Sequence, residues 1–312
     1  MLTAVDSELD GPVLVTGGCG FIGRAVVRAL LDTQTEVTVV DRVSPDSRTD
    51  GVRYVVGELG DGAVADSAVA PGTAAVIHLA AATSVLRSVQ QPVQTYADNV
   101  AVTQQLLEVA RTRSVGQFLL ASTNAVVGNV GEAVITERLP LRPLTPYGAT
   151  KAACEMLLSG YAGAYGMTTC ALRFSNVYGP GMALKDSFVP RLMRAALDGS
   201  TVTIYGDGTQ RRDLVHVDDV ARAVLLGRHS RYTGTAIVGA GCSVSVLDLV
   251  EAVRAVTGKP LPTRHVEPQQ GEMPAVVVDV AHSAEAIGYR PTVGLAEGLE
   301  STWRYFLDNV GA

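Results

Sequence analysis

The chain has 312 residues, of which 47% are hydrophobic, so it can bury the core of one large or two interleaved domains. Its 31 acidic and 25 basic residues give a net charge of −6, which argues against a nucleic-acid-binding surface. No charged-then-apolar segment and no apolar run of about 18 residues is found, so we expect neither a signal peptide nor contact with a membrane. The four cysteines lack paired spacing and the five histidines are scattered, so we expect reduced thiols, a cytoplasmic location and no metal site.

A glycine-rich turn separates the first predicted strand from the first predicted helix. The apolar run Pro12–Val15 is typical of a buried parallel strand, and residues 21–31 carry apolar side chains at helical spacing. The segment Thr16–Gly23 between them (TGGCGFIG) has glycines that allow a tight turn and a close approach of phosphates. A helix N-terminus adds free N–H groups and the positive end of a dipole. We therefore expect a dinucleotide to contact Gly17, Gly20, Phe21 and Ile22.

The second predicted strand, Glu36–Val40, ends at Asp41. A carboxylate there accepts hydrogen bonds from ribose hydroxyls and repels a 2′-phosphate, which favours NAD over NADP. Arg42 would partly offset that repulsion. The alternative is that Asp41 only ends a strand.

Two further strands complete the cofactor half. Arg53–Val56 precedes Glu58 and Leu59, which we expect beside the adenine. The segment Val76–Ala81 is a strand that runs into a turn of small residues. We expect this turn to lie under the cofactor with Leu79, Ala80 and Ala81, and His78 to be a packed residue rather than a catalyst.

A tyrosine and a lysine stand four residues apart at the start of a predicted helix over residues 147–165. Residues i and i+4 share one helix face, so Tyr147 and Lys151 point the same way. The lysine and a nicotinamide cation would lower the pKa of the phenol and make it a general base. The fifth strand, Phe118–Ala121, runs into Ser122 and Thr123. We expect Thr123 to bind the reacting oxygen; the alternative is that both hydroxyls only satisfy loop backbone.

The second half of the chain predicts a smaller cap over the cofactor domain. We expect helices at 189–197, 245–256 and 295–306 and a strand at 201–205. Residues 206–213 are expected to form a polar loop in which Arg212 binds phosphate and Arg211 is solvated. Asp218 is expected to cap a following helix with support from Asp219, and His216 to be structural.

These motifs together resemble the extended short-chain dehydrogenase/reductase family, in its nucleotide-sugar epimerase/dehydratase branch. The resemblance covers nearly the whole chain and rests on TGGCGFIG, Asp41, HLAA (78–81), Asn99, STNAVVG (122–128), YGATK (147–151), LRFSNVYGPG (172–181) and RRDLVHVDD (211–219). It implies an α/β fold, with a Rossmann-type doubly wound parallel sheet and a smaller C-terminal α/β substrate-binding domain. Residues 1–174 would bind NAD, residues 175–312 would mainly bind substrate, and about 212–240 would return to the first domain.

The resemblance also assigns roles to individual residues. Thr123, Tyr147 and Lys151 match the catalytic triad, and Lys151 would hold the nicotinamide ribose. Asn99 would contact the cofactor. Arg173 and Asn176 begin the substrate side, and Asn176 and Arg212 would meet the phosphates. We further expect the substrate side to include Ser84, Arg87, Val189, Tyr205, Gln269 and Glu272. Arg87 would meet a carboxylate of the sugar; the alternative is that it only forms a salt bridge on a helix. The family also implies a homodimer through helices at 94–113 and 147–165, although these faces could equally pack internally.

Departures from the family pattern bear on the reaction. The 4,6-dehydratases carry Asp-Glu after the catalytic threonine, whereas this chain has Asn124-Ala125 and lacks that acid and base. We therefore expect NAD-dependent C4 epimerisation of a UDP-sugar, UDP-glucose or UDP-galactose first. Val127 replaces an aromatic residue of the family, and Gln269 replaces an arginine on the diphosphate, so other substrates stay open. The alternatives are a UDP-glucuronate or UDP-N-acetylhexosamine 4-epimerase, a 4-ketoreductase or decarboxylase, and a non-catalytic NAD-sensing protein.

Overall fold

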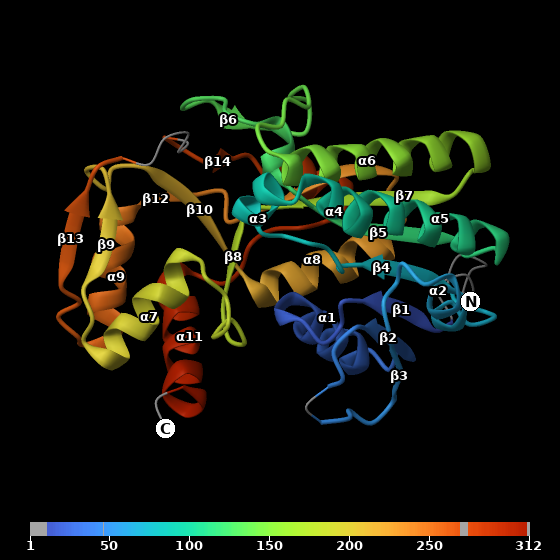
Figure 1. Ribbon diagram of the computed structural model, residues 1–312, viewed down its shortest axis with the longest axis horizontal. Helices are drawn as coiled ribbons and strands as arrows, with labels where there is room; N and C mark the ends of the chain where they lie inside the picture. The colour runs from blue at the N-terminus through green and yellow to red at the C-terminus, as the bar shows by residue number, and fades with distance from the viewer. Residues whose placement is uncertain (1–10, 46, 269–273, 311–312) are drawn as a thin grey trace.

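The structure is a computed structural model of the chain that describes residues 11–45, 47–268 and 274–310. Its larger lobe, on the right in Figure 1, is built on a seven-stranded sheet. The strands are β1 (Val13–Thr16), β2 (Val37–Asp41), β3 (Val52–Val56), β4 (Ala75–His78), β5 (Gln117–Thr123), β7 (Thr168–Phe174) and β11 (Gly234–Val238). They run parallel in the order β3-β2-β1-β4-β5-β7-β11, with Thr16 in register with both Val40 and His78.

The strand order reverses at β1, and this places a ligand crevice at the carboxyl ends of β1 and β4. The four residues of β1 are all buried, as expected for a parallel strand that is covered on both faces. This explains why the strands read as continuous apolar runs rather than as alternating ones.

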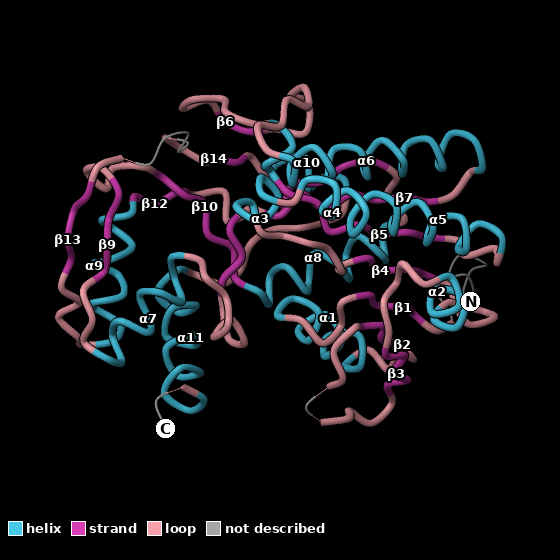
Figure 2. Tube along the Cα trace, in the orientation of Figure 1, coloured by secondary structure: helices cyan, strands magenta, loops and turns pink. Residues whose placement is uncertain are grey.

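Helices cover both faces of the sheet, as Figures 1 and 2 show. On one face α1 (Phe21–Asp32) packs against α8 (Val217–Ser230). The other face carries α2 (Gly62–Ala68), α5 (Val102–Thr112) and α6 (Pro146–Tyr165). Near α6 lie α3 (Val85–Gln90), α4 (Pro92–Tyr96) and η1 (Ala97–Ala101), a π-helical turn that joins α4 to α5. The helix expected over 94–113 is therefore present and contains a π-helical turn.

The smaller lobe lies at the opposite end of the molecule (Figure 1). Its helices are α7 (Phe188–Asp198), α9 (Val246–Thr257) and α11 (Leu295–Asn309). Its strands are β8 (Asn176–Tyr178), β9 (Val202–Tyr205), β10 (Arg211–His216), β12 (Ser243–Ser245) and β13 (Thr263–Val266). Two more strands, β6 (Val134–Ile135) and β14 (Val277–Val278), pair with each other, and α10 (Ala281–Ala286) contacts β11. Leu192, Leu249, Trp303 and Phe306 belong to the core of this lobe.

This architecture confirms the predicted fold class. The chain crosses between the lobes, because α8 and β11 follow β10 and lie with the large sheet. Among the described helices, none has both the length and the apolar character needed to span a bilayer.

Two local predictions were wrong. The segment expected as a loop over 206–213 contains the start of β10, because Arg211–Asp213 pair with β12 in antiparallel register. Its partner strand lies some 30 residues further along the chain (Asp213 pairs with Ser243), so local pattern did not reveal it. The N-cap of α8 is His216 and not Asp218: the His216 side chain accepts a hydrogen bond from the Asp218 N–H.

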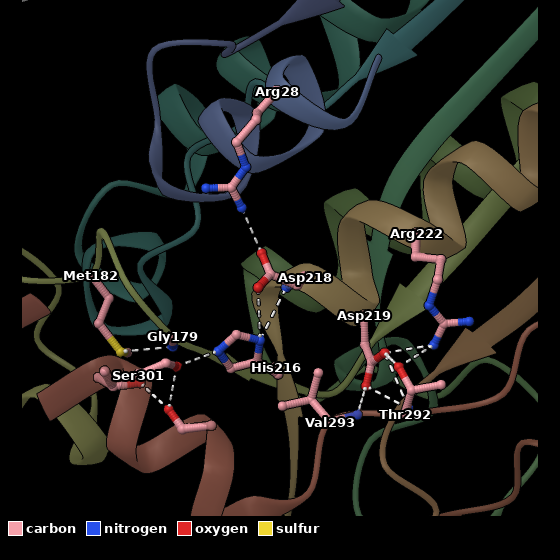
Figure 3. A network of polar contacts seen from close by, with 12 residues as sticks. Arg28, Gly179, Met182, His216, Asp218, Asp219, Arg222, Thr292, Val293 and Ser301 are labelled. Carbon is pink, nitrogen blue, oxygen red and sulfur yellow. Dashed lines mark hydrogen bonds and ion pairs between the residues drawn. The ribbon is translucent and has the colours of Figure 1, made fainter. Parts of the chain in front are cut away.

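The N-terminus of α8 joins the two lobes, as Figure 3 shows. Arg28 of α1 binds Asp218 at 2.8 Å, and His216 Nε2 lies 3.1 Å from Ser301 Oγ of α11. The Asp219 carboxylate accepts the N–H groups of Thr292 and Val293. Burial acts to raise the pKa of Asp219, but its hydrogen bonds, including one from Arg222, lower it overall. These contacts therefore fix the orientation of the two lobes around the crevice.

Candidate active site

A cavity of about 840 Å³ lies at the carboxyl ends of the large sheet and extends to the smaller lobe. Most of the residues expected to bind cofactor line it: Gly17, Gly20, Phe21, Ile22, Asp41, Arg42, Glu58, Leu59, Leu79, Ala80, Ala81, Tyr147 and Lys151. So do five residues of the expected substrate set: Thr123, Asn176, Val189, Tyr205 and Arg212. The fold thus brings most of the predicted cofactor and substrate residues to one cavity.

The glycine-rich turn is shaped to hold a pyrophosphate. Gly17 has a φ of +69°, and a Cβ there would lie 2.9 Å from the backbone nitrogen of Ala80. A Cβ on Gly23 would meet the carbonyl oxygen of Gly17 and the Cα of Gly18. Gly20 caps α1 without a side-chain hydrogen bond, which leaves helix N–H groups for an anion. The residues present therefore fit the dinucleotide.

The carboxylate at the end of β2 is tied to this turn. Asp41 Oδ2 accepts the N–H of Cys19 at 3.0 Å, and Oδ1 accepts that of Val43 at 3.2 Å. Each carboxylate oxygen has a second lone pair that can accept a ribose hydroxyl. Arg42 lies 3.9 Å from Glu58, so its charge is partly neutralised there. This arrangement favours NAD over NADP.

The three expected catalytic side chains meet at the end of β5. Tyr147 and Thr123 share a side-chain hydrogen bond, and Lys151 Nζ donates to the carbonyl oxygen of Ala121 at 2.9 Å. Thr123 Oγ1 also accepts the N–H of Ala125 at 3.2 Å. Thr123 thus satisfies loop backbone and faces the tyrosine as well. Thr145 caps α6 and Pro146 opens it, which sets where the helix begins and so where Tyr147 points.

The residues of the chain do not by themselves lower the pKa of the phenol, and the expected lowering also involved the charge of a bound nicotinamide. Burial raises the pKa of Tyr147 to about 12, and the hydrogen bond with Thr123 only partly opposes this. Burial also lowers the pKa of Lys151. Burial disfavours both the phenolate form of Tyr147 and the ammonium form of Lys151. The sequence could not show how deeply this part of α6 is buried.

The substrate side is built on β8 and β10. Asn176 Nδ2 donates to the carbonyl oxygen of Asp213 at 2.9 Å, and Arg212 Nη1 donates to that of Arg211 at 2.8 Å. Arg211 was expected to be solvated; it is exposed, but its Nη2 donates to the carbonyl oxygen of Ser243. The two neighbouring arginines therefore differ, because only Arg212 lines the cavity.

Several predicted residues lie elsewhere. Ser84 caps α3, and Arg87 Nε donates to Gln91 Oε1 at 3.1 Å. Asn99 is buried in η1, where its amide binds both backbone groups of Ala82. None of Ser84, Arg87 and Asn99 lines the cavity, and their binding roles stay predictions. Gln269 and Glu272 lie outside the described residues.

Arg173 was expected to begin the substrate side, and this was wrong. Its side chain points away from the cavity and forms a buried ion pair with Glu155 of α6. Two features of the sequence could have indicated this orientation. Side chains alternate between the two faces of a sheet along a strand such as β7, and Glu155 lies four residues after Lys151 on the same face of α6.

Sequence reasoning missed further polar side chains that line the substrate half. They are Lys185, Ser187, Arg191, Gln210 and Ser245. Arg191 is paired with Asp186 at 2.7 and 2.8 Å. Lys185 comes shortly after the YGPG motif (178–181), and a positive charge so near that motif could have indicated a residue of the substrate side.

A buried chain of hydrogen bonds links the glycine turn to α5 through His78. Thr103 donates its hydroxyl hydrogen to the carbonyl oxygen of Asn99, so His78 Nε2 must donate to Thr103 Oγ1. His78 Nδ1 then accepts from Thr16 Oγ1 at 2.7 Å. Burial, followed by the charge of Lys151, lowers the pKa of His78 to about 3. The neutral imidazole is therefore a structural link, as expected.

This histidine predicts acid sensitivity. The unfolded chain binds the proton at pH values near 6.5, whereas folded His78 does so near 3, so the free energy of unfolding falls as pH drops below 6.5. The slope from this one group is about 1.4 kcal/mol per pH unit. His78→Gln should lower stability at pH 7.5 and flatten the dependence between pH 6.5 and 5, measured by urea unfolding. The exposed His229→Gln is the control; an unchanged slope in His78→Gln would contradict the account.

Similarity to known proteins defines the class to which this chain belongs. A model of the NAD dependent epimerase/dehydratase family matches residues 13–234, and the chain belongs to this family. It is 32% identical to the dTDP-glucose 4,6-dehydratase of Streptomyces niveus, over 95% of this chain and 93% of that one. These findings confirm the resemblance found in the sequence and, with the glycine cradle, the prediction of NAD as cofactor.

Solved structures agree with this. The UDP-glucose 4-epimerase of Thermus thermophilus, solved with NAD, is 35% identical with a TM-score of 0.88, over 96% of this chain and all of that one. MoeE5, solved with UDP-glucuronic acid and NAD, is 35% identical with a TM-score of 0.90, over the same shares. The similar proteins thus include both epimerases and dehydratases.

Proposed function

We propose that this enzyme is a UDP-sugar 4-epimerase that acts first on UDP-glucose and UDP-galactose. The observation that carries the proposal is the pair Asn124-Ala125 directly after Thr123. Elimination of water needs an acid and a base, and neither side chain can serve. In the described residues, the carboxylates that line the cavity are Asp41, Glu58 and Asp98; Asp41 ends β2, Glu58 follows β3, and Asp98 accepts a hydrogen bond from Gln94.

The catalytic side chains suit proton transfer at a sugar hydroxyl. Bound NAD supplies the hydride acceptor and, beside the phenol, a positive charge. Tyr147 Oη takes the proton of the 4-hydroxyl and later returns it, while Thr123 holds the same oxygen. Lys151 places an ammonium one helical turn away. Asn176 and Arg212 hold the nucleotide so that the keto sugar can present its other face. The net redox change is zero, so no cofactor is consumed.

UDP-glucuronate is the second candidate substrate. The complex of MoeE5 with UDP-glucuronic acid supports it, and so do the additional cations Lys185 and Arg191 in the cavity lining. A 4-ketoreductase or decarboxylase uses the same keto stage, but would consume NADH or release carbon dioxide.

The function is tested by proton NMR of the purified enzyme with UDP-glucose, UDP-glucuronate and UDP-N-acetylglucosamine in separate tubes. We expect a new anomeric signal of the C4 epimer in the UDP-glucose tube, without NADH consumption. Silence in every tube, with and without added NAD or NADH, would contradict the proposal and favour an NAD-sensing role. A signal only in another tube would correct the sugar and keep the reaction.

Arg212 offers a test of substrate anchoring. Arg212→Gln should raise KM for the sugar nucleotide by about 10- to 100-fold, because a charge-assisted contact to the diphosphate is lost. NAD affinity should stay unchanged. Arg211→Gln is the matched control, since that guanidinium faces Ser243. Equal KM effects of the two substitutions would argue against the assignment.

We also propose a cytoplasmic homodimer. The four cysteines of each chain are free, which suits a reducing compartment. Apolar side chains on α3, α4 and α6 are exposed, among them Leu86 (68%), Val93 (81%) and Met156 (57%). These helices form one side of the large lobe and supply a face for a second copy.

The dimer can be tested directly. Sedimentation velocity should give twice the chain mass, and Leu86→Glu with Val93→Glu should give the single mass, because a charge buried without a partner opposes association. Leu184→Glu, at a side chain that is 99% exposed in a turn away from these helices, is the control. A monomeric parent chain would contradict the proposal.

A further inference from the structure

A buried ion pair lies behind the catalytic end of α6. The side chains of Glu155 and Arg173 are only 3% and 4% exposed. The carboxylate accepts Arg173 Nε at 3.0 Å and Nη2 at 2.7 Å, and it also accepts the hydroxyl of Ser122. Neither Glu155 nor Arg173 lines the cavity, so substrate binding does not account for the pair.

Stability alone does not account for it either. Removing two charges from water costs several kcal/mol per ion, and the attraction recovers this only when all polar atoms are satisfied. Arg173 Nη1 has no hydrogen-bond partner among the described residues. Apolar side chains of similar volume would hold α6, β5 and β7 together at least as well. Compared with apolar side chains, the ion pair adds a hydrogen bond of fixed orientation and a negative charge at the contact between α6 and β5.

The place is the contact between α6 and the end of β5. Three consecutive strand residues each bind one helix residue, and the helix residues are four apart: Ala121 with Lys151, Ser122 with Glu155, and Thr123 with Tyr147. The middle contact is the one backed by the ion pair. Any slip of β5 against α6 at Ser122 would therefore move Thr123 relative to the phenol.

The charge acts on Lys151 as well. Glu155 lies one turn further along the same helix face. Burial lowers the pKa of Lys151, and the negative charge of Glu155 is among the effects that act to raise it. The carboxylate therefore favours the ammonium form beside Tyr147, and Arg173 orients that carboxylate through two hydrogen bonds.

We propose that Glu155 is a positioning residue for the proton transfer, which fixes the end of β5 through Ser122 and holds a negative charge one turn behind Lys151. The inference rests on the proposed function only in taking Tyr147 as the base, and it is independent of which sugar is the substrate.

The chain has only three lysines, Lys151, Lys185 and Lys259, so NMR of protein labelled with ¹³C at lysine Cε can follow Lys151 directly. Two variants are compared with the parent chain: Glu155→Gln, and the double variant Glu155→Met with Arg173→Met. In both, Lys151 should lose its proton at a lower pH than in the parent chain, and the shift should be larger in Glu155→Gln, because the double variant also removes the opposing charge of Arg173. The alkaline limb of kcat should move in the same direction, with KM changed by less than about twofold. Glu251→Gln, which removes an exposed carboxylate from Arg254, should change neither.

An unchanged Lys151 titration in the double variant would overturn the proposal and leave the pair with a structural role. The double variant decides the matter if Glu155→Gln does not fold, because that single change leaves Arg173 buried without a counter-charge. The titration needs no turnover. A parent chain that converts no sugar nucleotide would therefore count against the proposed function and not against the role of Glu155.

Discussion

Tyr147→Phe should lower kcat by on the order of 10³-fold and leave the affinities for NAD and nucleotide sugar within about threefold. The phenyl ring fills the same space, so α6 and the cavity keep their shape. The lost group is the oxygen that shares a hydrogen bond with Thr123 and takes the sugar proton. A 10³-fold loss corresponds to about 4 kcal/mol of transition-state stabilisation.

The pH dependence provides a second readout. Burial raises the pKa of Tyr147 to about 12, and only the deprotonated phenol is a base, so the activity of the parent enzyme should rise with pH on its acid side. This limb should disappear in Tyr147→Phe. Tyr165→Phe, near the exposed end of the same helix, is the control and should leave both readouts unchanged. Retention of more than about a tenth of the activity in Tyr147→Phe would remove the proposed base.

Gly23→Ala should weaken NAD binding on the order of 100-fold and lower the free energy of unfolding by about 2–3 kcal/mol. The added Cβ would meet backbone atoms of Gly17 and Gly18, which cannot rotate aside as a side chain can. The turn must therefore open, and the N–H groups at the start of α1 lose their aim at the pyrophosphate.

The matched control is Gly160→Ala in the middle of α6. A Cβ there would have no neighbour within 4 Å, so the change should stabilise the protein by about 0.5–1 kcal/mol. Isothermal titration with NAD and urea unfolding measure the two effects. Normal NAD affinity in Gly23→Ala would show that the turn does not hold the pyrophosphate as proposed.

The cofactor half of the site could be predicted closely, because its signals are local. The run Pro12–Val15, the glycine turn and the helical repeat that follows occupy adjacent positions, and strand order then places Asp41 and Ala80 near them. Tyr147 and Lys151 could likewise be paired from the four-residue period of a helix.

Features that depend on distant parts of the chain could not be predicted. β10 exists because Arg211–Asp213 pair with β12, which lies about 30 residues further along the chain. Arg173 turns toward Glu155 because β7 stands beside β5 under α6, and a motif alone did not reveal that neighbour. The raised pKa of Tyr147 follows from its depth of burial, which only the packed structure defines.

The measurement that tests the central claim most directly uses UDP-glucose that carries deuterium at C4, followed by NMR after incubation with the enzyme. Epimerisation through Tyr147, Thr123 and Lys151 returns the same hydrogen to the carbon that lost it, so we predict UDP-galactose with deuterium retained at C4. A 4-keto-6-deoxy sugar with deuterium at C6 would show that water was eliminated, and it would contradict the account based on Asn124-Ala125.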